Sequence, residues 1–202
     1  MRILMCIIAA TVVLAACGGG NSKKTATPVA SAPARAATPA KSPPAKAATV
    51  APAACPTPPP GPPNSVIYQA AAPSQAQAVL NGVTVTTSSC TDIATFTFAG
   101  PDVPGYQAKY VPATAACGSG NPVTTAGPAQ LTLRFEPAVA HDNNGNVTVN
   151  TLALTPNLTS IKELKSTCDF EGVVAWVIGT EERYYTVTTA QNPSRIIVSI
   201  YQ

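Results

Sequence analysis

From Val66 to Gln202 the sequence consists of short runs rich in Val, Ile, Thr and aromatic residues, separated by Gly, Pro, Asn and Asp. Within the runs apolar and polar residues alternate, as in the stretch 131–136, where Leu, Leu and Phe alternate with Thr, Arg and Glu. Alternation with a period of two places one side of a strand against a core and the other in water. Helical periodicity is nearly absent, so we predict an all-β domain built as an antiparallel β-sandwich.

The runs predict strands over most of this region. Strands are expected at residues 79–87, 94–98, 106–111, 131–136, 161–166, 172–178, 184–189 and 195–201. The continuous apolar run 173–178 predicts the most deeply buried strand, because both of its faces avoid water. The two halves can also be laid on each other, with Ser89-Cys90-Thr91-Asp92 matched to Thr167-Cys168-Asp169 and a similar succession of strands and turns after each. We therefore predict an internal pseudo-repeat.

The first residues have the form of a secretory leader. A short positive end precedes the apolar stretch 3–14, which is too short to span a bilayer as a permanent helix. The form Leu14-Ala15-Ala16-Cys17, followed by glycines, resembles the lipobox of bacterial lipoproteins, in which the cysteine receives a diacylglycerol and the leader is cut before it. We predict a signal peptide over residues 1–16 and lipid attachment at Cys17. The alternative is an ordinary secretory leader with an incidental cysteine.

Residues 17–63 are predicted to be the lipid anchor and a disordered tether to a domain at 64–202. Between Gly18 and Pro63, 12 Pro and 13 Ala fill 25 of 46 positions, which leaves too little apolar surface to offset the entropy of ordering. The tether carries five basic residues and no acidic one, whereas six basic and nine acidic residues give the domain a net charge of −3. A domain of this charge has no basic footprint for nucleic acid.

Several stretches of the domain resemble a known family. The stretch 168–179 (CDFEGVVAWVIG), with the following hairpin to 185–187 and the closing 192–198, is similar to the end of an AMIN-like domain of actinobacterial lipoproteins. The stretches 95–98, 103–106 and 110–111 resemble its beginning, and the resemblance covers roughly residues 82–202. The related AMIN domains form symmetric β-sandwiches that localise proteins in the periplasm and are associated with peptidoglycan binding. The resemblance therefore implies an envelope module that binds a wall polymer.

Four cysteines remain when the leader and the lipid site are set aside. Cys55, Cys90, Cys117 and Cys168 form an even set in an oxidising compartment, which predicts disulfides with three possible connectivities. Their spacing is too scattered for a zinc site. If consecutive strands form a meander, the chain returns at Cys117 to the end where Cys90 lies. We therefore predict the pairs Cys90–Cys117 and Cys55–Cys168.

His141, the only histidine, stands in a loop of Asp, Asn and Gly. As a general base it would need a nucleophile and an orienting partner, a role that Asp142 imitates, but a lone histidine in such a turn is more simply a solvated residue. Asp142, Asn144 and Asn146 have the alternating spacing of calcium ligands, yet Gly145 separates the second from the third and no later Glu completes the loop. We predict no metal ion, no cofactor and no catalytic residue.

A few side chains are candidates for ligand contacts. Glu171, with Asp169, permits a paired-carboxylate interpretation, and the alternative is a polar turn ahead of a buried strand. Arg134 and Arg195 carry guanidinium groups that grip carboxylates, or else they form structural salt bridges. The tyrosines are either stacking platforms for sugar rings or half-buried strand residues; they are Tyr184, Tyr185, Tyr201, Tyr106 and Tyr110.

The expected function is that of a lipoprotein anchored in the cell membrane by its N-terminal lipid, on the extracytoplasmic face. Its domain is expected to be a noncatalytic module that binds peptidoglycan or an associated wall polymer, as the resemblance implies. The alternative is a protein-interaction module that docks another envelope protein through a sheet edge. An enzyme ranks last, because no nucleophile, base and orienting group can be assembled from the sequence.

Overall fold

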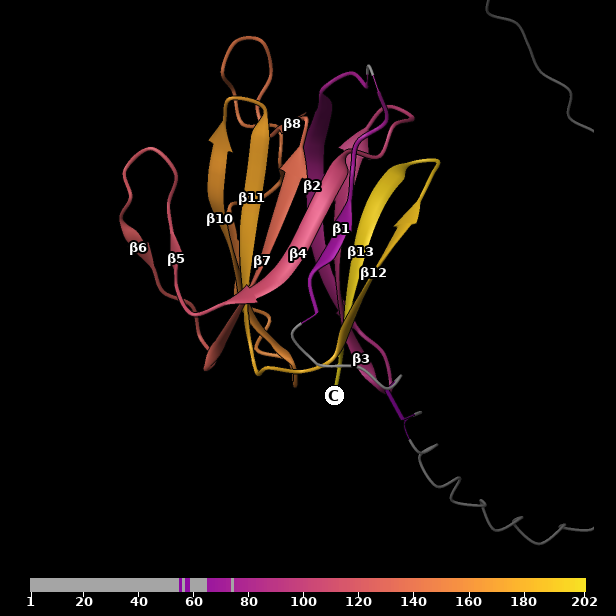
Figure 1. Cartoon of the computed structure of the whole chain (residues 1–202), viewed down its shortest axis with the longest axis vertical. Helices are drawn as coiled ribbons and strands as arrows, with labels where there is room; N and C mark the ends of the chain where they lie inside the picture. Colours follow the sequence, from indigo (N-terminus) through magenta and orange to yellow (C-terminus); the bar gives the residue numbers. More distant parts are fainter. Residues whose placement is uncertain (1–54, 56, 59–64, 74) are drawn as a thin grey trace, which may run out of the picture. The chain divides into compact units, whose positions relative to one another are not determined.

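The computed structural model describes residues 55, 57–58, 65–73 and 75–202 (Figure 1). The predicted signal peptide 1–16, the lipid site Cys17 and most of the predicted tether 17–63 lie outside the described residues. The described part is built from strands and loops, and none of it is a helix long and apolar enough to cross a membrane. The prediction of an all-β domain is confirmed.

Two sheets and one small hairpin contain all the strands of the described residues. Sheet A has the order β1 (Ile67–Gln69), β4 (Gly105–Val111), β7 (Ala129–Glu136), β11 (Val173–Thr180), β10 (Ile161–Phe170), β9 (Ala153–Leu154). Sheet B has the order β12 (Tyr185–Ala190), β13 (Ser194–Tyr201), β3 (Thr91–Ala99), β2 (Ala78–Thr87), β8 (Ala138–Val139). The hairpin pairs β5 (Thr114–Ala115) with β6 (Pro122–Val123). Neighbours are antiparallel except β2 and β8, which confirms the predicted sandwich.

Every strand expected from the alternation is present, with its ends shifted by a few residues. The alternation does not predict the short strands β1, β5, β6, β8 and β9, because two or three residues cannot display a period. The prediction that β11 is the most buried strand is confirmed. Trp176 is fully buried on its inner face and Val177 on its outer face.

The strand order also confirms the pseudo-repeat. The first half forms the hairpin β2–β3 and then the pair β4–β7, and the second half forms the hairpin β10–β11 and then the hairpin β12–β13. Each sheet takes one pair from each half, because β13 pairs with β3 and β7 pairs with β11. The halves therefore interlock, and neither completes a sheet alone. The matched cysteines are slightly displaced, since Cys90 lies in the β2–β3 turn and Cys168 within β10.

The core between the sheets centres on an aromatic cluster. Phe96 and Phe98 of β3 pack against Phe135 of β7, with ring centroids 5.0 and 5.4 Å apart. Phe96 also meets Trp176 of β11 edge-on at 5.8 Å. Such tilted contacts contribute about 0.5–1.5 kcal/mol each beyond the buried area. Because these strands come from both halves, the cluster stabilises the interlocked arrangement.

The outer face of β11 is covered by the segment that follows the β5–β6 hairpin. A Cβ at Gly179 would lie 2.0 Å from the carbonyl oxygen of Ala126, so the two backbones approach closely only because position 179 is glycine. The Ala126 amide donates to the Glu163 carboxylate at 2.8 Å, and Lys165 Nζ donates to the Thr124 carbonyl at 2.8 Å. These contacts explain why β11 is buried on both faces.

The disulfide pairing differs from the predicted one. Cys55 is bonded to Cys90 and Cys117 to Cys168, with Cα atoms 5.2 and 5.1 Å apart. The predicted pairing was wrong because it assumed a meander, whereas after β3 the chain crosses to sheet A and β4 does not return beside β2. The β5–β6 hairpin instead carries Cys117 to β10, where its amide donates to the Thr167 carbonyl at 2.9 Å. The prediction that these cysteines form disulfides is confirmed, and only their pairing is corrected.

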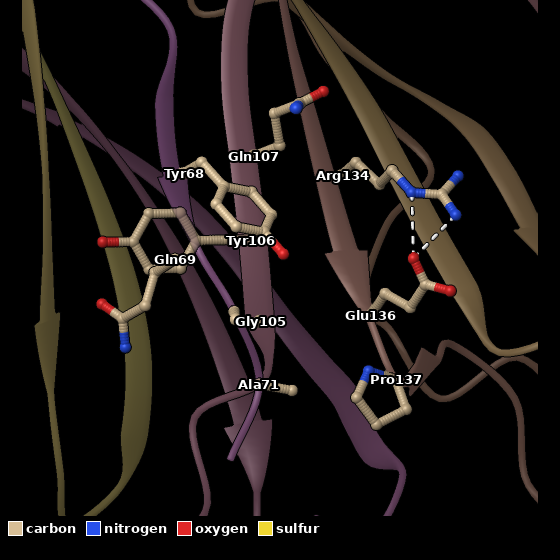
Figure 2. Close-up of a pocket in the computed structure, with 10 residues that line it drawn as sticks. Tyr68, Gln69, Ala71, Gly105, Tyr106, Gln107, Arg134, Glu136 and Pro137 are labelled. Carbon is tan, nitrogen blue, oxygen red and sulfur yellow. Dashed lines mark hydrogen bonds and ion pairs between the residues drawn. The ribbon is translucent and has the colours of Figure 1, made fainter. Parts of the chain in front are cut away.

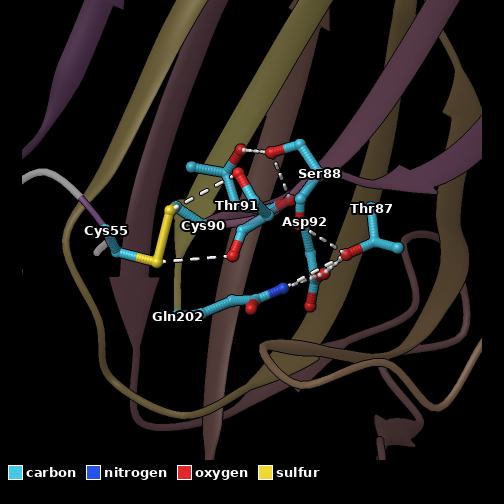
Figure 3. Close-up of a disulfide and its surroundings, with 8 residues drawn as sticks. Cys55, Thr87, Ser88, Cys90, Thr91, Asp92 and Gln202 are labelled. Atoms are coloured by element: carbon cyan, nitrogen blue, oxygen red, sulfur yellow. Dashed lines mark hydrogen bonds between the residues drawn. A yellow bond between two sulfur atoms is a disulfide. The ribbon is translucent and has the colours of Figure 1, made fainter. Parts of the chain in front are cut away.

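Beside the first disulfide, the buried carboxylate of Asp92 joins three segments of the chain, and Figure 3 shows two of its partners, Thr87 and Gln202. Its Oδ2 accepts hydrogen bonds from the amides of Ser160 at 2.5 Å and Ile161 at 3.1 Å. Its Oδ1 accepts from Thr87 Oγ1 at 2.7 Å and Gln202 Nε2 at 2.9 Å. Burial by itself raises the pKa of Asp92, but the hydrogen bonds, led by that of the Ser160 amide, outweigh it, and the pKa lies below its ordinary value.

Candidate binding groove

A groove opens on the outer face of sheet A, where β1, β4 and β7 run side by side (Figure 2). It encloses about 310 Å³, at the lower end of the range of small-molecule sites. Its lining comes from these strands and the loops at their ends: Tyr68, Gln69, Ala70, Ala71, Gly105, Tyr106, Gln107, Arg134, Glu136 and Pro137.

A row of side chains crosses the groove from strand to strand. The register pairs Tyr68 with Gln107, and Gln107 with Arg134. Directly opposite residues share one face of a sheet, so these side chains are neighbours. Figure 2 shows the Tyr68 side chain reaching across β4 on the side of Arg134 and Glu136. Tyr68 is 68% exposed, so its ring is open to a ligand beside amide and guanidinium groups.

The groove depends on the glycine at its floor. Gly105 lies opposite Glu136, and a Cβ on it would lie 2.5 Å from the Ala71 amide nitrogen and 2.7 Å from the Glu136 carbonyl oxygen. Those distances are shorter than real contacts, so a side chain there would force the segment after β1 away from β4. The close approach of the two backbones therefore requires Gly105.

The groove combines apolar and polar surface and is nearly neutral. Arg134 donates through Nη2 and Nε to Glu136 Oε2, at 2.8 and 3.2 Å, and both side chains are about half exposed. At this exposure the pair contributes little to stability, but it offers a ligand a donor and an acceptor side by side. Lys109 lies two residues from Gln107 on the same face of β4, and it has no ion pair among the described residues.

The other predicted ligand residues lie elsewhere. Arg195 is on β13, on the outer face of sheet B, and its Nε is buried with no hydrogen-bond partner among the described residues. Tyr184 meets Tyr201 edge-on at 5.3 Å, near the opposite end of β13 from Arg195. Glu171 is exposed in the β10–β11 turn, with a φ of 49°. Of these four candidates, only Arg134 lines the groove.

Most of the predicted stacking tyrosines have structural contacts instead. Tyr106 is 7% exposed and belongs to the core. The Tyr110 hydroxyl donates to the Arg183 carbonyl at 2.9 Å, and its ring meets that of Tyr185 at 5.5 Å. Burial, with the neighbouring Tyr110 as a second cause, raises the pKa of Tyr185 to about 12. Sequence reasoning missed Tyr68, because it follows the Pro-rich segment in a strand of only three residues.

The side chain of His141 is 40% exposed, as expected for a loop residue, but its carboxylate partner is Asp169 and not the neighbouring Asp142. Its Nδ1 lies 2.7 Å from Asp169 Oδ2, and Asp169 Oδ1 accepts the Ala140 amide at 3.0 Å. Asp169 thus ties β10 to the segment after β8, a contact between residues distant in sequence that no local pattern reveals. The pair therefore has an orienting carboxylate, and no hydroxyl or thiol is hydrogen-bonded to His141 among the described residues.

The loop after His141 uses its own carboxylate internally. Asp142 accepts hydrogen bonds from the amides of Asn144 and Asn146 and from the Asn146 side chain, at 2.8 to 2.9 Å. Hydrogen bonds from Asn146 are the largest cause of the lowered pKa of Asp142. Within residues 55, 57–58, 65–73 and 75–202, no cluster of three or more His, Cys, Asp or Glu side chains could hold a metal ion.

The fold defines a β-sandwich domain of two interlocked halves, and the comparison with known families identifies it. The family model of the AMIN-like domain matches residues 78–202, so the chain belongs to the AMIN-like domain family. No curated protein and no solved structure matches the chain. The match confirms the resemblance to an AMIN-like domain and begins at β2, so β1 and Tyr68 lie before it. The groove therefore combines two strands of the family domain with one strand contributed by the preceding segment.

Proposed function

We propose that this protein is a noncatalytic module of the cell envelope that holds peptidoglycan or an associated wall polymer in the groove beside β1. The observation that carries the proposal is the row of Tyr68, Gln107 and Arg134 along one face. A sugar ring stacks on an exposed aromatic ring, and its hydroxyl and acetamido groups bond to amide and guanidinium groups. Membership of the AMIN-like family supports the envelope setting.

The charge of the groove limits the kinds of ligand that can bind there. Glu136 neutralises Arg134, and the domain as a whole carries −3, so net attraction to an anionic polymer does not drive binding. The groove suits a chain of neutral sugar rings that carry occasional carboxylates, to which Lys109 is the nearest unpaired cation among the described residues. Binding that depends on local contacts persists at moderate salt, whereas binding by net charge is screened.

The proposal places the protein on the extracytoplasmic face of the cell membrane, held by a lipid on Cys17. The lipobox-like Leu14-Ala15-Ala16-Cys17 supports this location, and so do the two disulfides, because disulfides persist in oxidising compartments. The predicted tether would then let the domain reach the wall. Mass spectrometry of the membrane fraction should find a diacylated N-terminal cysteine, and Cys17→Ala should abolish it. Recovery of an unmodified mature chain from the wild type would contradict lipidation.

The test of binding is co-sedimentation with isolated cell wall, using the unlipidated chain that carries Cys17→Ala. That chain should pellet with the wall at low and moderate salt, and it should release no soluble fragments. Adding Arg134→Ala should weaken pelleting roughly tenfold, as expected for the loss of about 1.4 kcal/mol of binding free energy. Arg195→Ala, which removes the same group from the outer face of sheet B, is the matched control and should leave pelleting unchanged.

Each other outcome of this experiment points to a different function. If the chain stays in the supernatant with every wall fraction, the polymer proposal is abandoned and a module that docks another envelope protein takes its place. Release of soluble wall fragments would support an enzyme instead, although no hydroxyl or thiol of the described residues is hydrogen-bonded to His141.

A further inference from the structure

The edges of the two sheets are unequally protected. Three long strands near the edges are each flanked by a short one: β1 lies along β4, β9 along β10, and β8 along β2. β12 is different, because no strand of the described residues lies beyond it, and its six residues form an open edge. Open edges are templates for another strand, so natural proteins usually block them.

β12 lacks three of the usual blocking features, namely a charge, a proline and a bulge. Its sequence is Tyr-Thr-Val-Thr-Thr-Ala, without a charge or a proline. Its register with β13 runs without a bulge, whereas the pairings of β2 with β3 and of β10 with β11 contain irregularities. The edge is therefore regular, rich in β-branched residues and uncharged, which are the properties that favour pairing with a further strand.

The register shows which backbone groups face outward. The Tyr201 amide donates to the carbonyl of Tyr184, directly opposite it, at 3.0 Å. Hydrogen-bonded pairs alternate along an antiparallel ladder, so every second residue of β12 bonds to β13. The intervening residues direct their N–H and C=O groups to the open edge; they are Tyr185, Val187 and Thr189.

A strand that pairs with this edge must supply backbone N–H groups, and its charged side chains must not lie opposite like charges of β12 and its flanking residues. The preceding Pro/Ala-rich sequence is a poor occupant, because 12 of its 46 residues from 18 to 63 are prolines, which have no N–H group. A second β12 fits better. Antiparallel pairing about a two-fold axis at Val187 places Tyr185 opposite Thr189 of the other copy, and Arg183 opposite the uncharged Gln191.

We propose that β12 pairs with β12 of a second copy of this chain, which joins two B sheets into one continuous sheet across a two-fold axis. Each outward-facing residue then exchanges two backbone hydrogen bonds with the residue opposite it. The contact is the same surface on both copies, as in most homodimers. A single pair of strands buries less than a standard interface, so the dimer is weak, with a Kd on the order of 10 to 100 µM.

The test is sedimentation equilibrium of the unlipidated Cys17→Ala chain, at concentrations spanning about 1 µM to 1 mM around that expected Kd. Thr189→Pro removes an outward N–H group and leaves the hydrogen bonds between β12 and β13 intact, because the Thr189 side chain is exposed and its amide faces the edge. This variant should dimerise at least tenfold more weakly. Thr189→Val keeps the N–H group and is the matched control, with unchanged dimerisation.

A measurement without any substitution covers the case in which Thr189→Pro fails to fold. In the Cys17→Ala chain, the amides of Val187 and Thr189 should exchange with solvent quickly at low concentration and slowly at high concentration. The exchange rates of amides at the edges formed by β1, β8 and β9 should not depend on concentration. A monomer at every concentration would overturn the proposal, and so would a dimer that forms equally well with a folded Thr189→Pro chain or leaves these amides unprotected.

Discussion

The outer faces of the two sheets come from the same pattern of alternation, yet they present different surfaces. Sheet A is extended at one side by β1, which pairs with β4, and is covered at the other by the segment after the β5–β6 hairpin, and the groove lies beside β1. Sheet B presents rows of threonines, such as Thr95 beside Thr84, and Arg195 is the only charged residue on the outer face of β2, β3, β12 and β13. The outer face of sheet A is therefore hollowed by the groove, whereas that of sheet B is covered by threonine side chains.

The pseudo-repeat explains where this difference comes from. In the second half, β12 and β13 are joined by the tight turn 191–193, whereas in the first half residues 112–128 separate β4 from β7 and contain the β5–β6 hairpin. β1, before the family domain, has no counterpart in the second half. The groove therefore lies where added segments break the symmetry of the two halves. Family membership alone does not predict it.

The largest expected effect is a loss of stability in the core that supports both sheets. Trp176→Ala opens a cavity under β11, beside Phe96, and should lower the free energy of unfolding by about 3–5 kcal/mol. Trp176→Phe should cost much less, because the indole Nε1 has no hydrogen-bond partner in the described part of the chain. Urea unfolding followed by circular dichroism measures both. Similar losses for the two variants would contradict the account of the core.

The second effect distinguishes β1, at the edge of sheet A, from the segment after the β5–β6 hairpin that covers β11. Replacing Cys117 and Cys168 together by Ser should lower the free energy of unfolding by about 2–4 kcal/mol, since the bridge closes a loop of 51 residues in the unfolded chain. Wall binding by the chain that stays folded should persist, because neither cysteine lines the groove. Loss of binding without loss of stability would show that the hairpin, and not β1, forms the site.

The third effect is a dependence of stability on pH. It comes from Asp92 of sheet B, whose carboxylate is hydrogen-bonded to the start of β10 in sheet A. The pKa of Asp92 is lower in the folded chain than in the unfolded chain, so its contribution is complete above its ordinary value of 3.8 and is lost as pH falls below it. Asp92→Asn should cost about 2 kcal/mol at pH 7 and reduce this loss at acid pH. Urea unfolding at pH 7 and pH 3 tests the claim. An unchanged slope between these pH values would contradict the role of Asp92.

The smallest effect on stability comes from a substitution that should separate the outer faces of sheets A and B by their wall binding. Gly105→Ala should displace the segment after β1 and weaken wall binding several-fold, with a loss of stability of about 1 kcal/mol. Gly82→Ala is the matched change on sheet B, where a Cβ would meet Thr97 at an ordinary 3.5 Å, and it should affect neither property. Co-sedimentation and thermal unfolding of both variants check this. Equal behaviour of the two variants would contradict the account of the groove.

The sequence predicts the sandwich well because alternation over six to ten residues is a local signal. The strands around Phe96, Phe135 and Trp176 follow from it, and so does the order of the repeat. The disulfide pairing was wrong because it depends on which sheet β4 joins, and that is decided by packing between distant residues. The contact of His141 with Asp169 is long-range in the same way.

The site was predicted less well than the fold. Arg134 was identified from its chemistry, but Arg195, Tyr184 and Glu171 have the same kinds of groups on other surfaces. The role of Tyr68 could not be predicted from the sequence, because a strand of three residues after a Pro-rich segment resembles a linker. Which polar residues converge depends on the register across β1, β4 and β7, and composition does not determine register.

The most direct test of the claim that the hollowed face binds the wall is a chemical-shift map. The unlipidated Cys17→Ala chain, labelled with ¹⁵N, is titrated with solubilised wall fragments. We expect shifts confined to β1, β4 and β7, with the largest at Tyr68, Gln107 and Arg134, and none on β12 and β13. Shifts centred on the threonine rows of sheet B, or no shifts at saturating fragment, would contradict the account.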